Sequence, residues 1–144
     1  MTLEEILRSK GNVVYTISPD ATLDDVVAML VARNCGSLVV CRDDCGMAMV
    51  GIITERDILR ACAANRGALH SVRVAEVMSG QLVTGNMRDE VETVMGVMTR
   101  ERIRHLPVVE EGRLIGLVSI GDIVKAQHDR LTMENHYLKE YIQI

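Results

Sequence analysis

The chain of 144 residues consists of two copies of one unit, and this internal repeat limits its possible folds more than any other feature. At an offset of 68 positions, Thr16 aligns with Thr84. Further along each copy the offset is 65, so that Asp57 aligns with Asp122, because the first copy has three extra residues around 42–49. An upstream match at an offset of 71 extends the repeat over the whole chain.

Both copies have the same predicted order of secondary structure, β-α-β-β-α. Apolar residues at helical spacing mark the helices, and β-branched runs joined by polar turns mark the strands. The predicted strands are 13–17, 37–41 and 49–54 in the first copy and 82–84, 106–109 and 114–119 in the second. The predicted helices include 23–30, 55–64, 91–98 and the residues from 120 onward, with a short helix near 74–78. The fold class is therefore α/β.

A unit of roughly 60 residues buries too little surface to be stable alone, so we expect the two units to pack together. The predicted boundary divides the chain into residues 1–70 and residues 71–144, and the second unit carries an extended C-terminal helix. Pseudo-two-fold packing creates two equivalent clefts at the junction. Concave sites between subdomains are favoured places for ligands.

The strongest repeated motif lies where the last strand of each copy meets the last helix. It reads Gly-Ile-Ile-Thr-Glu-Arg-Asp at 51–57 and Gly-Leu-Val-Ser-Ile-Gly-Asp at 116–122. A hydroxyl followed three residues later by a carboxylate is typical of a helix N-cap, which is the structural interpretation. In the functional interpretation, the hydroxyl and the free N–H groups bind an anion, and the carboxylate accepts hydrogen bonds from ribose. The two interpretations are compatible, and the second one predicts a nucleotide.

The doubled unit with this motif resembles a tandem pair of CBS domains, the family named after cystathionine β-synthase. The segment Arg-Ile-Arg-His-Leu-Pro-Val-Val at 102–109, followed by the second motif, is similar to that family's second domain, and the resemblance covers the whole chain. It implies a regulatory module that binds AMP, ADP, ATP or S-adenosylmethionine between the units, with NAD(H) as a further candidate. It also implies a homodimer that signals to another protein by conformational or oligomeric change.

The resemblance implies nucleotide-binding roles in both copies. Asp57 and Asp122 would bind ribose hydroxyls, and Thr54 and Ser119 would bind phosphate or ribose. The other candidates are Thr16, Ser37, Arg56, Thr84, Arg104, His105 and Pro107. Among them, Thr16 and Thr84 would bracket the base with their backbone groups.

The two sites differ in charge. Arg104 and His105 would face phosphate, whereas their counterparts in the first copy are Gly36 and Ser37. We therefore expect the site built on the second copy to prefer the more charged ligand or to bind it more tightly. Arg56 either reaches a phosphate or lies on the solvated face of its helix.

The chain has no Phe and no Trp, so adenine would lie between aliphatic side chains. The predicted walls are Leu38, Ile53, Leu106 and Val118. Tyr15 either stacks on a ligand or is a partly buried strand residue. The lack of large aromatic rings also argues against a platform for single-stranded nucleic acid, and the net charge of −4 argues against duplex DNA.

Several further classes are disfavoured. No stretch approaches the ~20 apolar residues of a membrane span, and the N-terminus has no signal-peptide pattern, so we predict a cytoplasmic protein. Cys41 and Cys45 are three residues apart beside two aspartates, but no second close pair completes a zinc site. We expect free thiols, no metal and no catalytic residues.

The segment 121–144 is predicted to be one long helix with an apolar stripe at Ile123, Val124, Leu131, Leu138, Tyr141 and Ile142. This stripe would pack on the chain's own units or on a second chain, and its length favours a dimer. Two alternative functions stay open. One is a structural dimerisation module with empty clefts, and the other is an enzyme that acts on an adenine nucleotide.

Overall fold

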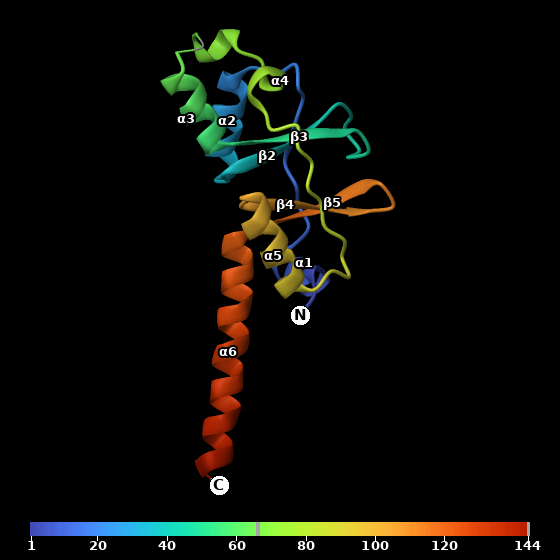
Figure 1. The fold of residues 1–144 in the computed structure, drawn as a ribbon, viewed down its shortest axis with the longest axis vertical. Helices are drawn as coiled ribbons and strands as arrows, with labels where there is room; N and C mark the ends of the chain where they lie inside the picture. The colour runs from blue at the N-terminus through green and yellow to red at the C-terminus, as the bar shows by residue number, and fades with distance from the viewer. Residues whose placement is uncertain (66, 144) are drawn as a thin grey trace.

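Two units of strands and helices lie one above the other in the computed structural model, which describes residues 1–65 and 67–143 (Figure 1). The first unit contains β1 (Thr16–Ile17), α2 (Leu23–Arg33), β2 (Ser37–Cys41), β3 (Met49–Thr54) and α3 (Glu55–Ala63). The second contains α5 (Val91–Glu101), β4 (His105–Glu110), β5 (Arg113–Ser119) and α6 (Ile120–Gln143). Helix α1 (Leu3–Lys10) precedes the first unit. The 3-10 helix η1 (Leu69–Ser71) and helix α4 (Val74–Val77) lie in the segment that connects the two units. The predicted tandem α/β fold is confirmed.

The two copies pair their strands in the same register. In the first copy β1 runs parallel to β2, β2 runs antiparallel to β3, and Ser37 pairs with Thr54. In the second copy β4 runs antiparallel to β5, and His105 pairs with Ser119. These pairs are equivalent at the offsets of 68 and 65, and both hairpins have a register shift at the equivalent place. The repeat in the sequence is therefore a repeat in the structure.

The second copy lacks the first strand that the sequence predicts at 82–84. Only Gly85 pairs there, as an isolated parallel bridge to Val108. Its N–H donates to the carbonyl of Pro107 at 2.9 Å, and its carbonyl accepts from the N–H of Val109 at 2.9 Å. The prediction is wrong because residues 82–84 make no ladder of their own, and two of them line the cavity between the units.

Each unit takes a helix from the segment that precedes the other unit in the chain. The side chains of Leu3 and Leu7 in α1 are buried in the core of the second unit, together with Met98 of α5. Val74 at the start of α4 is buried in the core of the first unit, together with Leu23 of α2. Figure 1 shows the same crossing, with α1 beside α5 and α4 beside α2. The boundary near residue 70 stays a prediction.

The first glycine of each repeated motif leaves room for the crossing segment. A Cβ atom at Gly51 would lie 2.7 Å from the backbone oxygen of Ser79 and 2.8 Å from the sulfur of Met78. A Cβ atom at Gly116 would lie 2.6 Å from a methyl group of Leu7, the counterpart of Met78 at an offset of 71. Packing therefore leaves little room for a side chain at either position, and least at Gly51, where the neighbour is a backbone atom.

The last helix extends beyond the body of the molecule (Figure 1). Ile123 in its first turn is 1% exposed, whereas Leu131, Leu138 and Tyr141 are 64%, 59% and 79% exposed. The helix predicted over 121–144 is confirmed to residue 143, and residue 144 lies outside the described residues. The described residues of the chain's own units leave most of the apolar stripe uncovered. None of the described helices, α6 included, is long and apolar enough to cross a membrane.

Candidate functional site

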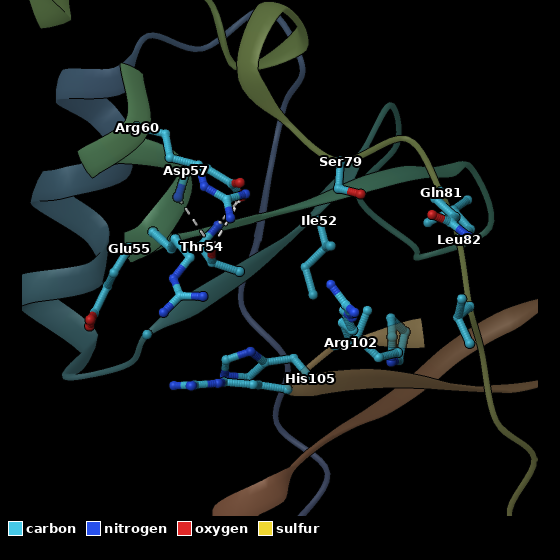
Figure 2. A pocket seen from close by; sticks show the side chains of 16 residues that line it. Ile52, Thr54, Glu55, Asp57, Arg60, Ser79, Gln81, Leu82, Arg102 and His105 are labelled. Carbon is cyan, nitrogen blue, oxygen red and sulfur yellow. Dashed lines mark hydrogen bonds between the residues drawn. The ribbon is translucent and has the colours of Figure 1, made fainter. Parts of the chain in front are cut away.

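A cavity of about 490 Å³ lies between the two units. Its lining comes from the start of α3, from the connection at 79–83 and from the segment that leads into β4. Figure 2 shows Thr54 and Asp57 of the first copy facing Arg102 and His105 of the second copy across this space. The volume lies within the range of small-molecule sites, which is about 300–1,000 Å³.

The first copy of the motif caps α3 and leaves one carboxylate oxygen unused. The N–H and the hydroxyl of Thr54 donate to Oδ2 of Asp57 at 2.8 and 3.1 Å, and the N–H of Asp57 donates to the Thr54 hydroxyl at 3.4 Å. The capping interpretation is therefore confirmed. Oδ1 of the half-buried Asp57 receives no hydrogen bond from residues 1–65 and 67–143, so it is available to a ligand.

Positive charge dominates the cavity. Four arginines line it: Arg56, Arg60, Arg102 and Arg104. The carboxylates in the lining are those of Glu55 and Asp57. Within the described part of the chain, none of the four guanidinium groups forms an ion pair. Unpaired guanidinium groups suit phosphate, because their fixed fork of N–H donors matches its oxygens.

His105 lies half-buried in the lining, and its environment keeps the imidazole neutral. Burial lowers the pKa of His105 below its ordinary value of 6.5, and the positive charges of Lys10 and Arg104 lower it further. The carboxylates of Asp122 and Glu55 oppose this shift in the pKa without cancelling it. A neutral imidazole can both donate and accept a hydrogen bond at neutral pH.

The second copy of the motif has the same cap and a different neighbour. The N–H of Ser119 donates to Oδ2 of Asp122 at 2.8 Å, and the N–H of Asp122 donates to the Ser119 hydroxyl at 3.1 Å. The ammonium of Lys10 donates to the same Oδ2 and to the carbonyl of Leu117, both at 2.6 Å. Burial raises the pKa of Asp122, but the hydrogen bonds from Lys10 and Ser119 and the charge of Lys10 outweigh it and hold the pKa below its ordinary value.

The structure brings together about half of the residues predicted for the site. Those that line the cavity are Thr54, Arg56, Asp57, Arg104, His105 and Pro107. Those outside its lining are Thr16, Ser37, Thr84, Ser119 and Asp122. From the sequence, Arg104 was expected beside the second copy's motif, whereas its side chain lies with the first. The reason is that the segment leading into β4 faces the motif of the other unit.

The aliphatic walls were assigned to the wrong face of the sheets. Leu38, Ile53, Leu106 and Val118 are 0–1% exposed and belong to the two hydrophobic cores. Side chains alternate across a strand, so Ile52, the neighbour of Ile53, faces the cavity instead. The other apolar residues of the lining are Leu82, Val83, Ile103 and Pro107.

Tyr15 is a partly buried residue outside the cavity lining. It packs against the core of the first unit, and the guanidinium carbon of Arg33 lies 4.8 Å from the centre of its ring. One face of the ring is therefore covered by a cation. This environment agrees with the structural alternative for Tyr15.

Two arginines of the cavity were not predicted from the sequence. Arg60 follows Asp57 by three positions, so helical spacing places both side chains on one face of α3, and this signal could have identified it. Arg102 ends α5 with φ at 56°, a left-handed conformation that non-glycine residues seldom adopt. The direction of its side chain depends on that local geometry and could not be inferred from spacing.

The cysteine pair lies away from this cavity. Cys45 donates a hydrogen bond to Oδ2 of Asp43 at 3.0 Å. Burial and the negative charge of Asp43 raise the pKa of the Cys41 thiol, so it stays protonated at neutral pH. Among the described residues, no three His, Cys, Asp or Glu side chains are grouped so as to hold a metal ion.

Comparisons with known proteins agree with this architecture. The sequence model of the CBS domain matches residues 2–64 and again residues 74–129. The chain is 35% identical over 148 aligned positions to the mitochondrial CBS domain-containing protein CBSX3 of Arabidopsis thaliana, covering 99% of this chain and 72% of that protein. The crystal structure of the CBS-domain containing protein ATU1752 from Agrobacterium tumefaciens matches with a TM-score of 0.81 and 35% identity, over 88% of this chain and 99% of that one.

A further solved structure carries ligands. It is the CBS domain pair of protein MJ0100 in complex with methylthioadenosine and S-adenosyl-L-methionine. It matches with a TM-score of 0.79 and 25% identity, over 90% of this chain and 98% of that one. Two tandem matches to the domain, together with the repeated sheets and crossing helices, show that the chain belongs to the CBS-domain family as a tandem pair.

Proposed function

We propose that this CBS pair is a regulatory module that binds a phosphorylated adenine nucleotide, of the AMP, ADP and ATP class, in the cavity between its units. One observation carries the proposal. Asp57, whose Oδ1 receives no hydrogen bond from the described residues, lines the same cavity of about 490 Å³ as four arginines without ion pairs among those residues. A carboxylate suits ribose hydroxyls, and guanidinium groups suit phosphate.

Each part of the ligand has a matching part of the cavity. Oδ1 of Asp57 binds the ribose hydroxyls, and Thr54 and Arg56 lie beside the phosphates. Arg104 reaches the phosphates from the second unit, and Ile52 packs against adenine. The ligands of the MJ0100 pair support the adenosine class. The excess of arginines favours phosphorylated members of that class, NAD(H) included, over the positively charged S-adenosylmethionine.

The mechanism is a shift between arrangements of the two units. The cavity is lined by residues of both units, so a bound nucleotide favours the arrangement in which they lie close together. A partner protein then responds to that arrangement. Binding alone is enough for this function, and we assign no catalytic step to the chain.

Native mass spectrometry of the freshly purified protein, followed by calorimetry with AMP, ADP, ATP, NADH and S-adenosylmethionine, tests the proposal. We expect an adenine nucleotide to co-purify and the phosphorylated ligands to bind more tightly than S-adenosylmethionine. If nothing co-purifies and no ligand binds, a structural module with empty clefts replaces the proposal. If incubation with ATP yields a product, the chain is an enzyme.

We also propose a homodimer in which α6 contributes the contact. Leu131, Leu138 and Tyr141 expose apolar surface along a helix that leaves the body of the chain. Burial of such a stripe between two helices stabilises a dimer. Light scattering of a chain shortened after Gln127 should show a monomer, and a shortened chain that stays dimeric would contradict this role of α6. A cytoplasmic location stays a prediction, since the plant relative is named as mitochondrial.

A further inference from the structure

The two copies of the motif have different neighbours within the chain itself. We propose that Lys10 closes the second cleft from within, so that each chain binds nucleotide in the first cleft alone unless Lys10 is displaced. This inference rests on the proposed function of the first cleft. Its support comes from the contacts of the Lys10 ammonium and from the equivalence of the two motifs.

The backbone of the two motifs is built alike. The carbonyl of Gly36 accepts from the N–H of Glu55 at 3.1 Å, and the carbonyl of Arg104 accepts from the N–H of Ile120 at 2.9 Å. These two contacts are equivalent at the offsets of 68 and 65. The repeat therefore predicts a second cleft that begins at Ser119 and Asp122, equivalent to the cavity that begins at Thr54 and Asp57.

The ammonium of Lys10 lies beside the second motif, where the carbonyl it binds corresponds to the Ile52 carbonyl that accepts from the N–H of Ser79 in the first copy. It is 2.6 Å from the carbonyl oxygen of Leu117 and 2.6 Å from Oδ2 of Asp122. Their counterparts, Ile52 and Asp57, both line the cavity of the first cleft. Lys10 binds the same Oδ2 that serves the cap, so Oδ1 of Asp122 receives no hydrogen bond from residues 1–65 and 67–143. A ribose that approached this oxygen would have to move the adjacent ammonium and so break a charge-assisted hydrogen bond, which is stronger than one between neutral groups.

The segments before the two clefts explain why only one of them is closed. Helix α1 continues to Lys10, which brings its side chain to β5. Helix α4 ends earlier, and Ser79 then exchanges two backbone hydrogen bonds with Ile52, at 2.9 and 3.0 Å. The counterpart of Lys10 at an offset of 71 is Gln81, whose amide donates to Glu101 at 3.3 Å. Within the described part of the chain, Asp57 therefore has no cation equivalent to Lys10.

The second cleft also lacks the arginines of the first. The residues equivalent to Arg56, Arg60, Arg102 and Arg104 are Gly121, Lys125, Asn34 and Gly36. One cation thus replaces four at these positions. A phosphorylated ligand would find fewer partners there, even after Lys10 has moved.

Calorimetry on the full chain tests the inference by counting sites, with AMP and methylthioadenosine as the probes. We expect one site per chain in the unchanged protein and two in Lys10→Met. Asp57→Asn alone should weaken the single site by about 10–100-fold. Lys10→Met combined with Asp57→Asn should keep one unweakened site, and adding Asp122→Asn should weaken that site as well. The matched control is Arg8→Met, which removes a cation from the same helix and should leave one site.

Two equal sites in the unchanged protein, or a single site in Lys10→Met, would overturn the inference. A second measurement does not need a nucleotide. Titration of the Asp122 carboxyl by NMR should show a higher pKa in Lys10→Met than in the unchanged protein, and an unchanged pKa would refute the contact itself. If no probe binds any of the variants, the proposed function fails, while the titration still decides whether Lys10 holds Asp122.

Discussion

The two copies of the motif share a backbone and a helix cap, yet their carboxylates have different surroundings. Asp57 uses one oxygen for the cap and lines a cavity rich in arginine. Asp122 makes the same cap and also binds Lys10. The cap depends on residues three positions apart, whereas the surroundings depend on distant parts of the chain. A repeated motif therefore does not by itself make a repeated site.

This difference between the copies also changes the expected charge preference. From the sequence, the more charged ligand was expected at the site built on the second copy, because Arg104 belongs to that copy. The side chain of Arg104 lines the cavity of the first copy's motif. We now propose that the first cleft, which contains Asp57, prefers the more highly phosphorylated ligand.

The largest expected difference between the copies is in nucleotide binding. Asp57→Asn should weaken AMP binding by about 10–100-fold, because a hydrogen bond to a charged group contributes roughly 1.5–3 kcal/mol. Asp122→Asn should change the affinity by less than about 2-fold, since the Lys10 ammonium bound to Oδ2 of Asp122 keeps nucleotide out of the second cleft. Calorimetry measures both variants, and equal losses would contradict the difference. Thermal unfolding is the control, because both substitutions alter a helix cap.

The two motif glycines should differ in stability. Gly51→Ala places a methyl group against the backbone oxygen of Ser79, which cannot move away, so we expect the free energy of unfolding to fall by about 2–3 kcal/mol. Gly116→Ala meets only the flexible end of Leu7 and should lower it by about 1 kcal/mol. Urea unfolding measures both values. A larger loss of stability in Gly116→Ala than in Gly51→Ala would show that Leu7 yields less to a methyl group than the backbone of Ser79 does.

Arg104 should separate phosphate recognition from adenosine recognition. Arg104→Ala should weaken ATP binding by roughly 5–10-fold and leave methylthioadenosine binding unchanged, because only ATP presents phosphate to the guanidinium. Lys125→Ala, which removes the cation from the helix of the second motif, should affect neither ligand. Calorimetry at low salt is the measurement, because salt screens these charges. An unchanged ATP affinity would remove Arg104 from the site.

The smallest effect concerns pH. The pKa of His105 is lowered in the folded protein, so the unfolded chain binds more protons once the pH falls below about 6.5. The free energy of unfolding should therefore decrease as the pH falls from about 7 towards 5, by roughly 1 kcal/mol or less. His105→Gln should flatten this dependence in urea unfolding, whereas His136→Gln, in the exposed tail, should preserve it. The same slope in both variants would contradict the role of His105.

Local sequence signals predicted most of the fold. The strands predicted at 37–41 and 49–54 have these limits in the structure, and α6 begins at 120 as expected. Such strands depend on runs of apolar residues, and such helix starts depend on hydrogen bonds between residues three positions apart. The strand predicted at 82–84 failed because pairing partners, and not apolar residues alone, make a strand, and only Gly85 found one there.

The site was only partly predictable for the same physical reason. The sequence by itself determined the repeat, the two caps and the absence of Phe and Trp, because each can be read from composition, from self-similarity or from spacing within a few residues. Only the tertiary structure decided that Ile52 and not Ile53 faces the cavity, and that Arg104 joins Asp57. It also decided that Lys10 reaches Asp122, since those two residues are separated by 112 positions and meet only when α1 packs on the second unit.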